Sequence, residues 1–252
     1  PYRTLFRSVV ILDEVHYLAD KMRGPVWEEV IIHLPAHVAI IALSATVSNA
    51  EEFGAWIREV RSSCEIVVSE KRPVPLYQHM IVGEDIFDLY APTGRGKLNP
   101  ELVAATRDSG MRGGRGSRSW NREVHVRRES RPSTLISLDR AGLLPAITFI
   151  FSRAGCEDAV RQILSTRITL TTRSEAAEIE SYVDEVIALL PPEDAIVLGA
   201  ESWKRGLMRG IAAHHAGMLP LMKETVEHLF SRGLVKMVYA TETLALGINM
   251  PA

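Results

Sequence analysis

Residues 8–16 read SVVILDEVH, and this stretch decides the fold. Four apolar residues in a row (9–12), three of them β-branched, predict a short strand buried on both faces of a parallel sheet. Asp13 and Glu14 follow where that strand ends. In open α/β sheets, ligands bind just beyond the carboxyl ends of the strands, so an acidic pair at this point indicates a site. An aspartate there can hold Mg²⁺ on a nucleotide and a glutamate can activate water, whereas a solvated acidic turn is the alternative.

Outward from this stretch, strands and helices alternate. The first part of the chain has strand patterns at residues 38–43, 66–68 and 76–82, and helix patterns at residues 25–34 and 53–60. The later part has strand patterns at residues 145–151, 211–213 and 235–240, and helix patterns at residues 154–164, 172–190 and 219–230. Thr172 and Glu175 have the spacing of a capping box at the start of one of these helices. The alternation predicts an α/β fold with doubly wound parallel sheets.

Residues 91–132 break this pattern. They are rich in Gly, Arg and Ser, and they carry ten Lys and Arg against four Asp and Glu, a local charge of +6 in a chain whose net charge is −2. Such a composition buries little apolar surface, so we expect a flexible basic insertion between two domains. Contact with nucleic-acid phosphates and a merely solvated linker are both compatible with it. Just before it, residues 85–90 suggest a helix.

The composition is that of an ordinary globular protein. Of the 252 residues, 46% are hydrophobic and 24% are charged, which supports one large or two modest domains. The two cysteines, Cys64 and Cys156, are far apart, so reduced thiols in the cytoplasm are the economical interpretation. No apolar run approaches the ~18 residues of a membrane span. We therefore expect a cytoplasmic protein without a membrane partner.

Five segments, taken in order, carry a resemblance to a known family. They are Asp13-Glu14-Val15-His16, Leu43-Ser44-Ala45-Thr46, residues 149–153 (FIFSR), residues 214–218 (HHAGM) and residues 240–251 (ATETLALGINMP). In this order they resemble the DExH-box helicases of superfamily 2. The last two resemble the Ski2-like branch, including its actinobacterial members. The resemblance covers residues 1–90 and 135–252.

The resemblance implies two RecA-like domains. Residues 1–82 would be the C-terminal part of the first, residues 83–134 the linker with the basic insertion, and residues 135–252 the second. The family has a Walker A loop upstream of its DExH strand and a Gly-Arg-rich motif after its Asn-x-Pro segment. Neither is found here, so we expect both domains to be truncated. The chain would be an internal fragment of a longer helicase, inactive in ATP hydrolysis by itself.

The same resemblance implies roles for single residues. Asp13 would organise Mg²⁺ through water, Glu14 would be the catalytic base, and His16 would hydrogen-bond between the ATP site and the second domain or the Ser44-Ala45-Thr46 loop, which couples the domains. Gly247 and Asn249 would lie near the nucleotide or the domain interface. Nucleic-acid contacts would come from Ser152, Arg153, His214, His215, Thr241, Glu242 and Thr243. Adjacent residues of an extended segment point to opposite faces, so we expect one histidine in the core and the other along the nucleic-acid path.

The implied activity is ATP-dependent unwinding with ATP and Mg²⁺ as cofactors. The partner would be single-stranded or duplex RNA or DNA, with RNA favoured, and an RNA-processing complex is a further candidate partner of a monomeric enzyme. One alternative is a non-catalytic module that binds nucleic acid or acts as a scaffold. A second is a metal-dependent hydrolase that uses Asp13, Glu14 and the histidines.

Overall fold

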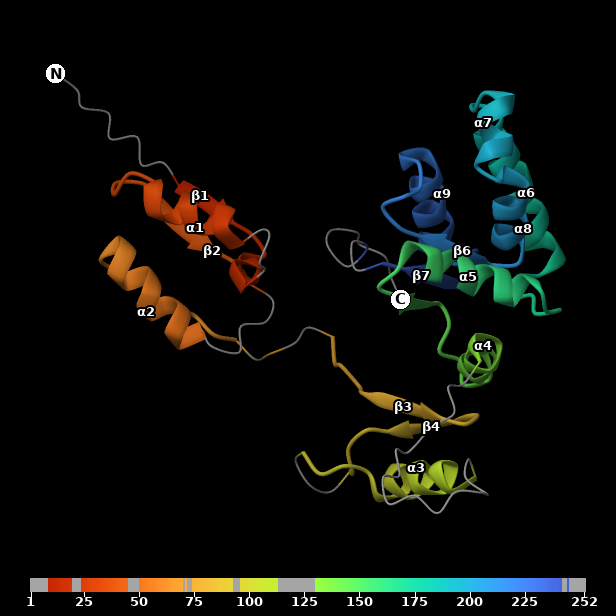
Figure 1. Ribbon diagram of the computed structural model, residues 1–252, viewed down its shortest axis with the longest axis horizontal. Coiled ribbons are helices and arrows are strands. Elements are labelled where there is room, and N and C mark those ends of the chain that lie inside the picture. The colour runs from red at the N-terminus through yellow and green to blue at the C-terminus, as the bar shows by residue number, and fades with distance from the viewer. Residues whose placement is uncertain are drawn as a thin grey trace, which may run out of the picture. The chain divides into compact units, whose positions relative to one another are not determined.

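The computed structural model describes residues 9–19, 24–44, 50–69, 71, 74–92, 96–112, 130–241 and 244 (Figure 1). The chain divides into two compact units, Pro1–Leu76 and Tyr77–Ala252. Both contain parallel strands joined through helices, which confirms the α/β class with parallel sheets. Among the described residues, no helix combines the length and the apolar character that a membrane crossing needs.

The first unit is a parallel strand pair with two helices on one face. Strand β1 (Val9–Leu12) leads through the 3₁₀ helix η1 (Val15–Ala19) and helix α1 (Gly24–His33) to strand β2 (Ala39–Ala42), which is followed by helix α2 (Ala50–Arg61). The register runs from Val9 opposite Ala39 to Leu12 opposite Ala42. The predicted strand at 38–43 and the two predicted helices are confirmed, whereas residues 66–68 do not form a strand.

The burial of β1 differs from the expectation. Leu12 packs with Ile31 of α1 and Ile57 of α2, and Val10 lies against this cluster. Val9 and Ile11 are 52% and 63% exposed. Side chains alternate across a strand, and both described helices of this unit pack on the face of Val10 and Leu12. Among the described residues, that face of β1 is therefore the buried one.

The second unit opens with an antiparallel hairpin and two helices. Strands β3 (His79–Val82) and β4 (Asp85–Asp88) pair through a turn at Gly83, whose φ is 67°. Helices α3 (Pro100–Arg112) and α4 (Arg131–Arg140) follow. The helix expected at residues 85–90 was wrong, because a glycine in the left-handed region makes the two-residue turn that a hairpin needs.

Part of the segment expected to be flexible is helical. Asn99 accepts a hydrogen bond from the backbone N–H of Glu101 (3.0 Å), and Pro100 is the first residue of α3. An asparagine at the N-cap followed by proline strongly favours the start of a helix. The prediction of a flexible segment rested on composition and did not take this pair into account. Residues 113–129, with most of the arginines of the predicted insertion, lie outside the described residues.

The rest of the second unit is a three-stranded parallel sheet in the order β5-β7-β6. Its strands are β5 (Ala146–Phe149), β6 (Ile211–His214) and β7 (Met237–Ala240), and its helices are α5 (Arg153–Leu164), α6 (Arg173–Ile187), α7 (Pro192–Val197), α8 (Ala200–Met208) and α9 (Pro220–Ser231). All residues of β6 and β7 are buried. Side chains of α4 and α5 cover one face, while α6, α8 and α9 cover the other. The sheet is therefore doubly covered here, as the sequence predicts.

The predicted capping box opens α6 and ties this helix to the sheet. Thr172 Oγ1 accepts from the N–H of Glu175 (3.2 Å), and Glu175 Oε2 accepts from the N–H of Thr172 (2.6 Å). Lys236, just before β7, donates to both oxygens of Glu175 (2.9 and 3.2 Å). The Thr172 backbone N–H, and after it Lys236, lower the pKa of Glu175.

We predict a pH-dependent loss of stability for Glu175→Gln. A lowered pKa in the folded state stabilises the protein above the unfolded pKa of about 4.3, and that stability is lost as the pH falls through the folded value. At pH 7 the substitution should cost about 1 kcal/mol, which lowers the Tm by about 2–4 °C. Thermal unfolding followed by circular dichroism at several pH values measures this. The difference from the wild type should vanish in acid, and an equal difference at every pH would contradict the assignment.

The matched control for this experiment is Glu185→Gln. Glu185 is exposed on the same helix, so its replacement removes the same charge without removing the contacts to Thr172 and Lys236. Surface substitutions of this kind change stability by less than about 0.5 kcal/mol.

Candidate active site and nucleic-acid interface

A sharp turn places the acidic pair at the carboxyl end of β1. Glu14 has a φ of 53°, in the left-handed region that non-glycine residues rarely adopt. The chain therefore turns directly after the strand, and Asp13 Oδ1 accepts a hydrogen bond from the N–H of Glu14 (2.9 Å). Backbone strain of this kind persists only where the surroundings hold it, and it is concentrated at functional sites.

His16 lies between Glu14 and the end of β2. Its Nδ1 is 3.2 Å from Glu14 Oε2 and 3.5 Å from Ser44 Oγ. Two backbone bonds keep the strand ends aligned, from Leu43 N to Leu12 O (2.8 Å) and from Val15 N to Leu43 O (2.9 Å). The structure thus gathers the side chains of Asp13, Glu14, His16 and Ser44 at one edge of the sheet. Ala45 and Thr46 lie outside the described residues.

The oxygen atoms at this edge suit a hard cation. Asp13 is exposed and the Glu14 side chain is 42% exposed, so both carboxylates are open to a ligand. Mg²⁺ prefers oxygen ligands and is often held by one or two carboxylates, with water and substrate phosphate completing its shell. Among the described residues there is no group of three or more His, Cys, Asp or Glu side chains that could hold a metal alone. The donor set therefore fits Mg²⁺ bound together with a nucleotide.

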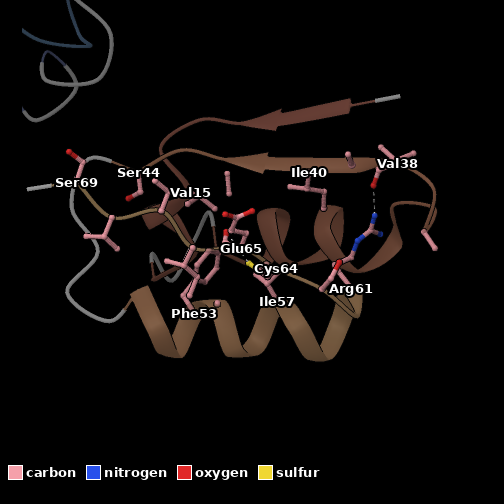
Figure 2. A pocket seen from close by; sticks show the side chains of 18 of the residues that line it. Val15, Val38, Ile40, Ser44, Phe53, Ile57, Arg61, Cys64, Glu65 and Ser69 are labelled. Atoms are coloured by element: carbon pink, nitrogen blue, oxygen red, sulfur yellow. Dashed lines mark hydrogen bonds between the residues drawn. The ribbon is translucent and has the colours of Figure 1, made fainter. Parts of the chain in front are cut away.

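A groove of about 890 Å³ lies beside this edge, between β2, α2 and residues 63–69 (Figure 2). Val15 and Ser44 line it, whereas Asp13, Glu14 and His16 do not. At its other end the Arg61 guanidinium donates to the carbonyls of Leu34, Pro35 and Val38. The groove therefore adjoins the acidic pair without containing it.

In the second unit, the ends of the three parallel strands meet at one edge. Ile150 N donates to Ala240 O (2.7 Å), and Thr241 N donates to His214 O (3.2 Å). These bonds align the residues that follow β5, β7 and β6. Glu242, Thr243, Gly247 and Asn249 lie outside the described residues.

Ser152 and Arg153 begin α5 at this edge. Ser152 caps the helix, because its Oγ accepts from the N–H of Gly155 (3.1 Å). Arg153 is exposed, and its guanidinium forms no salt bridge within the part of the chain that the structure describes. A free guanidinium beside a helix N-terminus is well suited to a phosphate.

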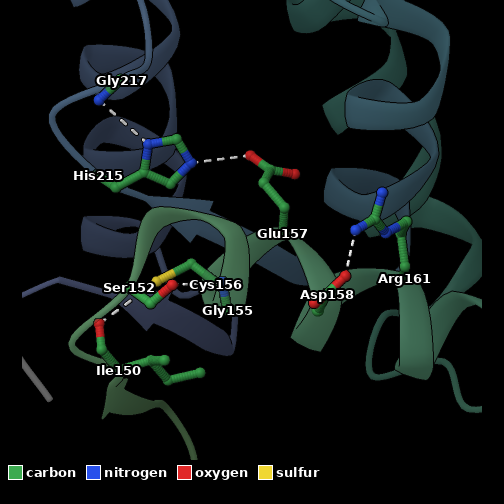
Figure 3. Close-up of polar contacts among 9 residues, drawn as sticks. All are labelled: Ile150, Ser152, Gly155, Cys156, Glu157, Asp158, Arg161, His215 and Gly217. Carbon is green, nitrogen blue, oxygen red and sulfur yellow. Dashed lines mark hydrogen bonds and ion pairs between the residues drawn. The ribbon is translucent and has the colours of Figure 1, made fainter.

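The two histidines at the end of β6, His214 within the strand and His215 directly after it, point to opposite faces of the sheet, as expected, but neither is open to solvent. His214 is 4% and His215 is 6% exposed. His214 Nε2 is 2.7 Å from Glu227 Oε1 of α9, and His215 Nε2 is 2.9 Å from Glu157 Oε1 of α5 (Figure 3). Both rings are thus enclosed here, and a nucleic-acid contact by one of them stays a prediction. Burial and glutamate partners make both rings part of the packing.

Glu157 and Glu227 were not singled out in the sequence. A helical glutamate is usually a solvated residue, and nothing in its spacing from a histidine far along the chain reveals a contact. The sequence offered only an indirect indication of these two partners: a histidine expected in the core needs hydrogen-bond partners, but the sequence does not say which residues they are. Glu157 also affects the neighbouring Cys156. The pKa of the Cys156 thiol is raised mainly by burial and, to a smaller extent, by the negative charge of Glu157.

One other titratable group lies beneath this edge. Tyr239 of β7 is 2% exposed, and burial raises its pKa to about 12. The phenol therefore stays protonated at neutral pH and belongs to the core between the sheet and α5.

Comparison with known proteins assigns this arrangement to a family. The pattern of the DEAD/DEAH box helicase family matches residues 3–53. The chain is 52% identical to "Probable helicase HelY" of Mycobacterium tuberculosis over 97% of its length, which is 28% of that protein. It is 42% identical to the chloroplastic "DExH-box ATP-dependent RNA helicase DExH15" of Arabidopsis thaliana, with 97% of this chain and 23% of the relative covered.

A third relative is "Superkiller complex protein 2" of Homo sapiens, at 39% identity over 96% of this chain and 20% of the relative. The chain thus spans about a quarter of the length of the curated relatives it matches. The family pattern covers the acidic turn, and each of these relatives aligns with nearly the whole chain. The chain belongs to the DExH-box helicases, in their Ski2-like group.

Proposed function

We propose that this chain is the part of an ATP-driven nucleic-acid helicase in which Asp13 and Glu14 serve ATP hydrolysis and the sheet edge of the second unit holds the nucleic-acid backbone. The observation that carries the proposal is the turn after β1. It presents two open carboxylates, and His16 connects Glu14 to Ser44 at the end of the neighbouring strand.

In this proposal Asp13 would hold Mg²⁺ through water, and the bound Mg²⁺ would supply positive charge for the nucleotide phosphates. Glu14 orients the attacking water and accepts its proton. Its carboxylate is suited to this role because it is exposed and lies within 3.2 Å of an imidazole that can bind or release a proton. His16 and the 44–46 loop then pass on the state of the nucleotide site, since the hydroxyls of Ser44 and Thr46 can change partners.

The second unit would contact the nucleic-acid backbone through Ser152, Arg153 and Thr241, joined by Glu242 and Thr243. A free guanidinium and hydroxyl groups beside a helix N-terminus are donors that phosphate oxygens accept. Gly247 and Asn249 would lie near the nucleotide or the domain interface. We infer that residues 1–82 and residues 135–252 are parts of two RecA-like domains, with residues 83–134 as the linker. We favour RNA over DNA because one of the relatives is named as an RNA helicase. Another relative is named as a protein of a complex, which is compatible with the RNA-processing complex expected above as a partner.

The first prediction from this proposal concerns Glu14→Gln in the full-length protein that contains this chain. Glutamine keeps the size of the side chain but cannot accept the proton of water. The kcat of ATP hydrolysis should fall by about 10²–10⁴-fold while nucleotide binding remains. A phosphate-release assay and a fluorescent nucleotide titration measure the two quantities.

Glu28→Gln is the matched control, because Glu28 is exposed on α1 of the same unit. It should leave turnover unchanged. Full activity in Glu14→Gln would rule out Glu14 as the catalytic base. A wild-type protein that binds nucleic acid but shows no ATP turnover would instead support the alternative of a module without catalysis.

A second prediction concerns Arg153→Ala and the binding of fluorescein-labelled oligo(U). Losing one charged phosphate contact should weaken binding about tenfold. It should also reduce the slope of log K against log salt by about 0.7. Fluorescence anisotropy at several salt concentrations gives both values.

Arg161→Ala controls for the loss of a positive charge. Arg161 lies on the same helix, where it forms an ion pair with Asp158 (Figure 3). Its removal should change neither the affinity nor the slope. An Arg153 variant that binds oligo(U) like the wild type would rule out this residue as a phosphate contact.

A further inference from the structure

We propose that Glu157 is a positioning residue of the nucleic-acid interface: its carboxylate fixes the ring of His215, and the ring shapes the turn against which the Arg153 side chain lies. The proposal rests on the phosphate contact proposed above for Arg153. It assigns a role to a residue that no motif of the chain includes.

The hydrogen bonds of His215 define its tautomer. The backbone N–H of Gly217 can only donate, and it lies 3.2 Å from His215 Nδ1, so this nitrogen accepts and carries no proton. The proton is therefore on Nε2, which donates to Glu157 Oε1 at 2.9 Å. Both nitrogens are used, so the ring has none left for a nucleic acid.

The turn beyond His215 packs closely against the His215 ring and the Arg153 side chain. A Cβ on Gly217 would lie 3.2 Å from His215 Nδ1 and 3.3 Å from Arg153 Cδ, tighter than ordinary van der Waals contact. The ring of His215, the backbone of Gly217 and the stem of Arg153 are thus packed together. A ring that rotates away from Glu157 loses the Gly217 bond and the surface that supports Arg153.

If Glu157 acted only through its charge, its removal would strengthen nucleic-acid binding, whereas a positioning role predicts weaker binding. Its side chain is 50% exposed, and it belongs to the same helix as Arg153. A negative charge near a phosphate site weakens binding, so its removal should strengthen binding if Glu157 had no positioning role. The direction of the change therefore separates the two accounts.

The test measures oligo(U) affinity for single variants of the 252-residue chain. Glu157→Ala should weaken binding about five- to tenfold, because the acceptor for Nε2–H is gone. Glu157→Gln should bind at least as tightly as the wild type, because its amide oxygen can still accept that proton and the negative charge is gone. Gly217→Ala should weaken binding as Glu157→Ala does. Asp158→Ala is the matched control, since it removes the neighbouring acid of α5 and should not weaken binding.

The tautomer is measured separately, by the ¹⁵N chemical shifts of the labelled histidine rings. The wild type and Glu157→Gln should show the Nε2–H form for His215, and Glu157→Ala should lose it. If Glu157→Ala does not fold, Glu157→Gln and Gly217→Ala decide the question. Binding that is unchanged or tighter in Glu157→Ala, beside weakened binding in Arg153→Ala, would overturn the proposal.

Failure of the Arg153 contact gives a different pattern. In that case Arg153→Ala binds oligo(U) normally, and the ¹⁵N spectra of the histidine rings alone test the role of Glu157. Loss of the Nε2–H form in Glu157→Ala supports the positioning of His215 by Glu157. Retention of that form overturns the positioning role. If Glu157 acts through Arg153, the double variant Glu157→Ala/Arg153→Ala should bind no more weakly than Arg153→Ala.

Discussion

Parallel strand pairing is the constraint on which both units depend. Parallel strands end at the same edge of a sheet, so the residues that follow different strands become neighbours in space although they are far apart in sequence. In the first unit this brings Asp13 and Glu14 to Ser44, and the pairing continues past the strands through Leu43 and Val15. In the second unit it aligns the ends of β5, β7 and β6. Each unit thereby gathers its polar side chains at one edge.

Each edge also has local features in addition to the strand pairing. Glu14 adopts a left-handed backbone at the end of a strand, which costs about 1–2 kcal/mol for a non-glycine residue. His214 and His215 are buried in adjacent positions, and each hydrogen-bonds a glutamate from a helix on its own side of the sheet. The two glutamates thus tie the end of β6 to α9 on one face and to α5 on the other. The strand end and its turn are held from both sides.

The limits of prediction follow from the range of each interaction. Strands and helices with strong periodicity, such as α2 and α9, and the capping box of Thr172 were predictable because their signals are local. The hairpin of β3 and β4 was missed because a single glycine at position 83 outweighs the helical pattern after it. Helix α3 was missed because the basic composition around it hid the cap at Asn99.

The sequence by itself determined the chemistry available: which residues follow each strand, their order along the chain and, through that order, the family. Hydrophobic periodicity and the capping residues at helix ends act over a few residues, so the amino-acid sequence shows them directly. Only the tertiary structure decided which of these side chains meet. It left one face of β1 exposed, buried both histidines and paired them with Glu227 and Glu157, which lie 13 and 58 residues away. Such contacts depend on how helices pack across a sheet, and packing joins residues whose separation in sequence carries no signal.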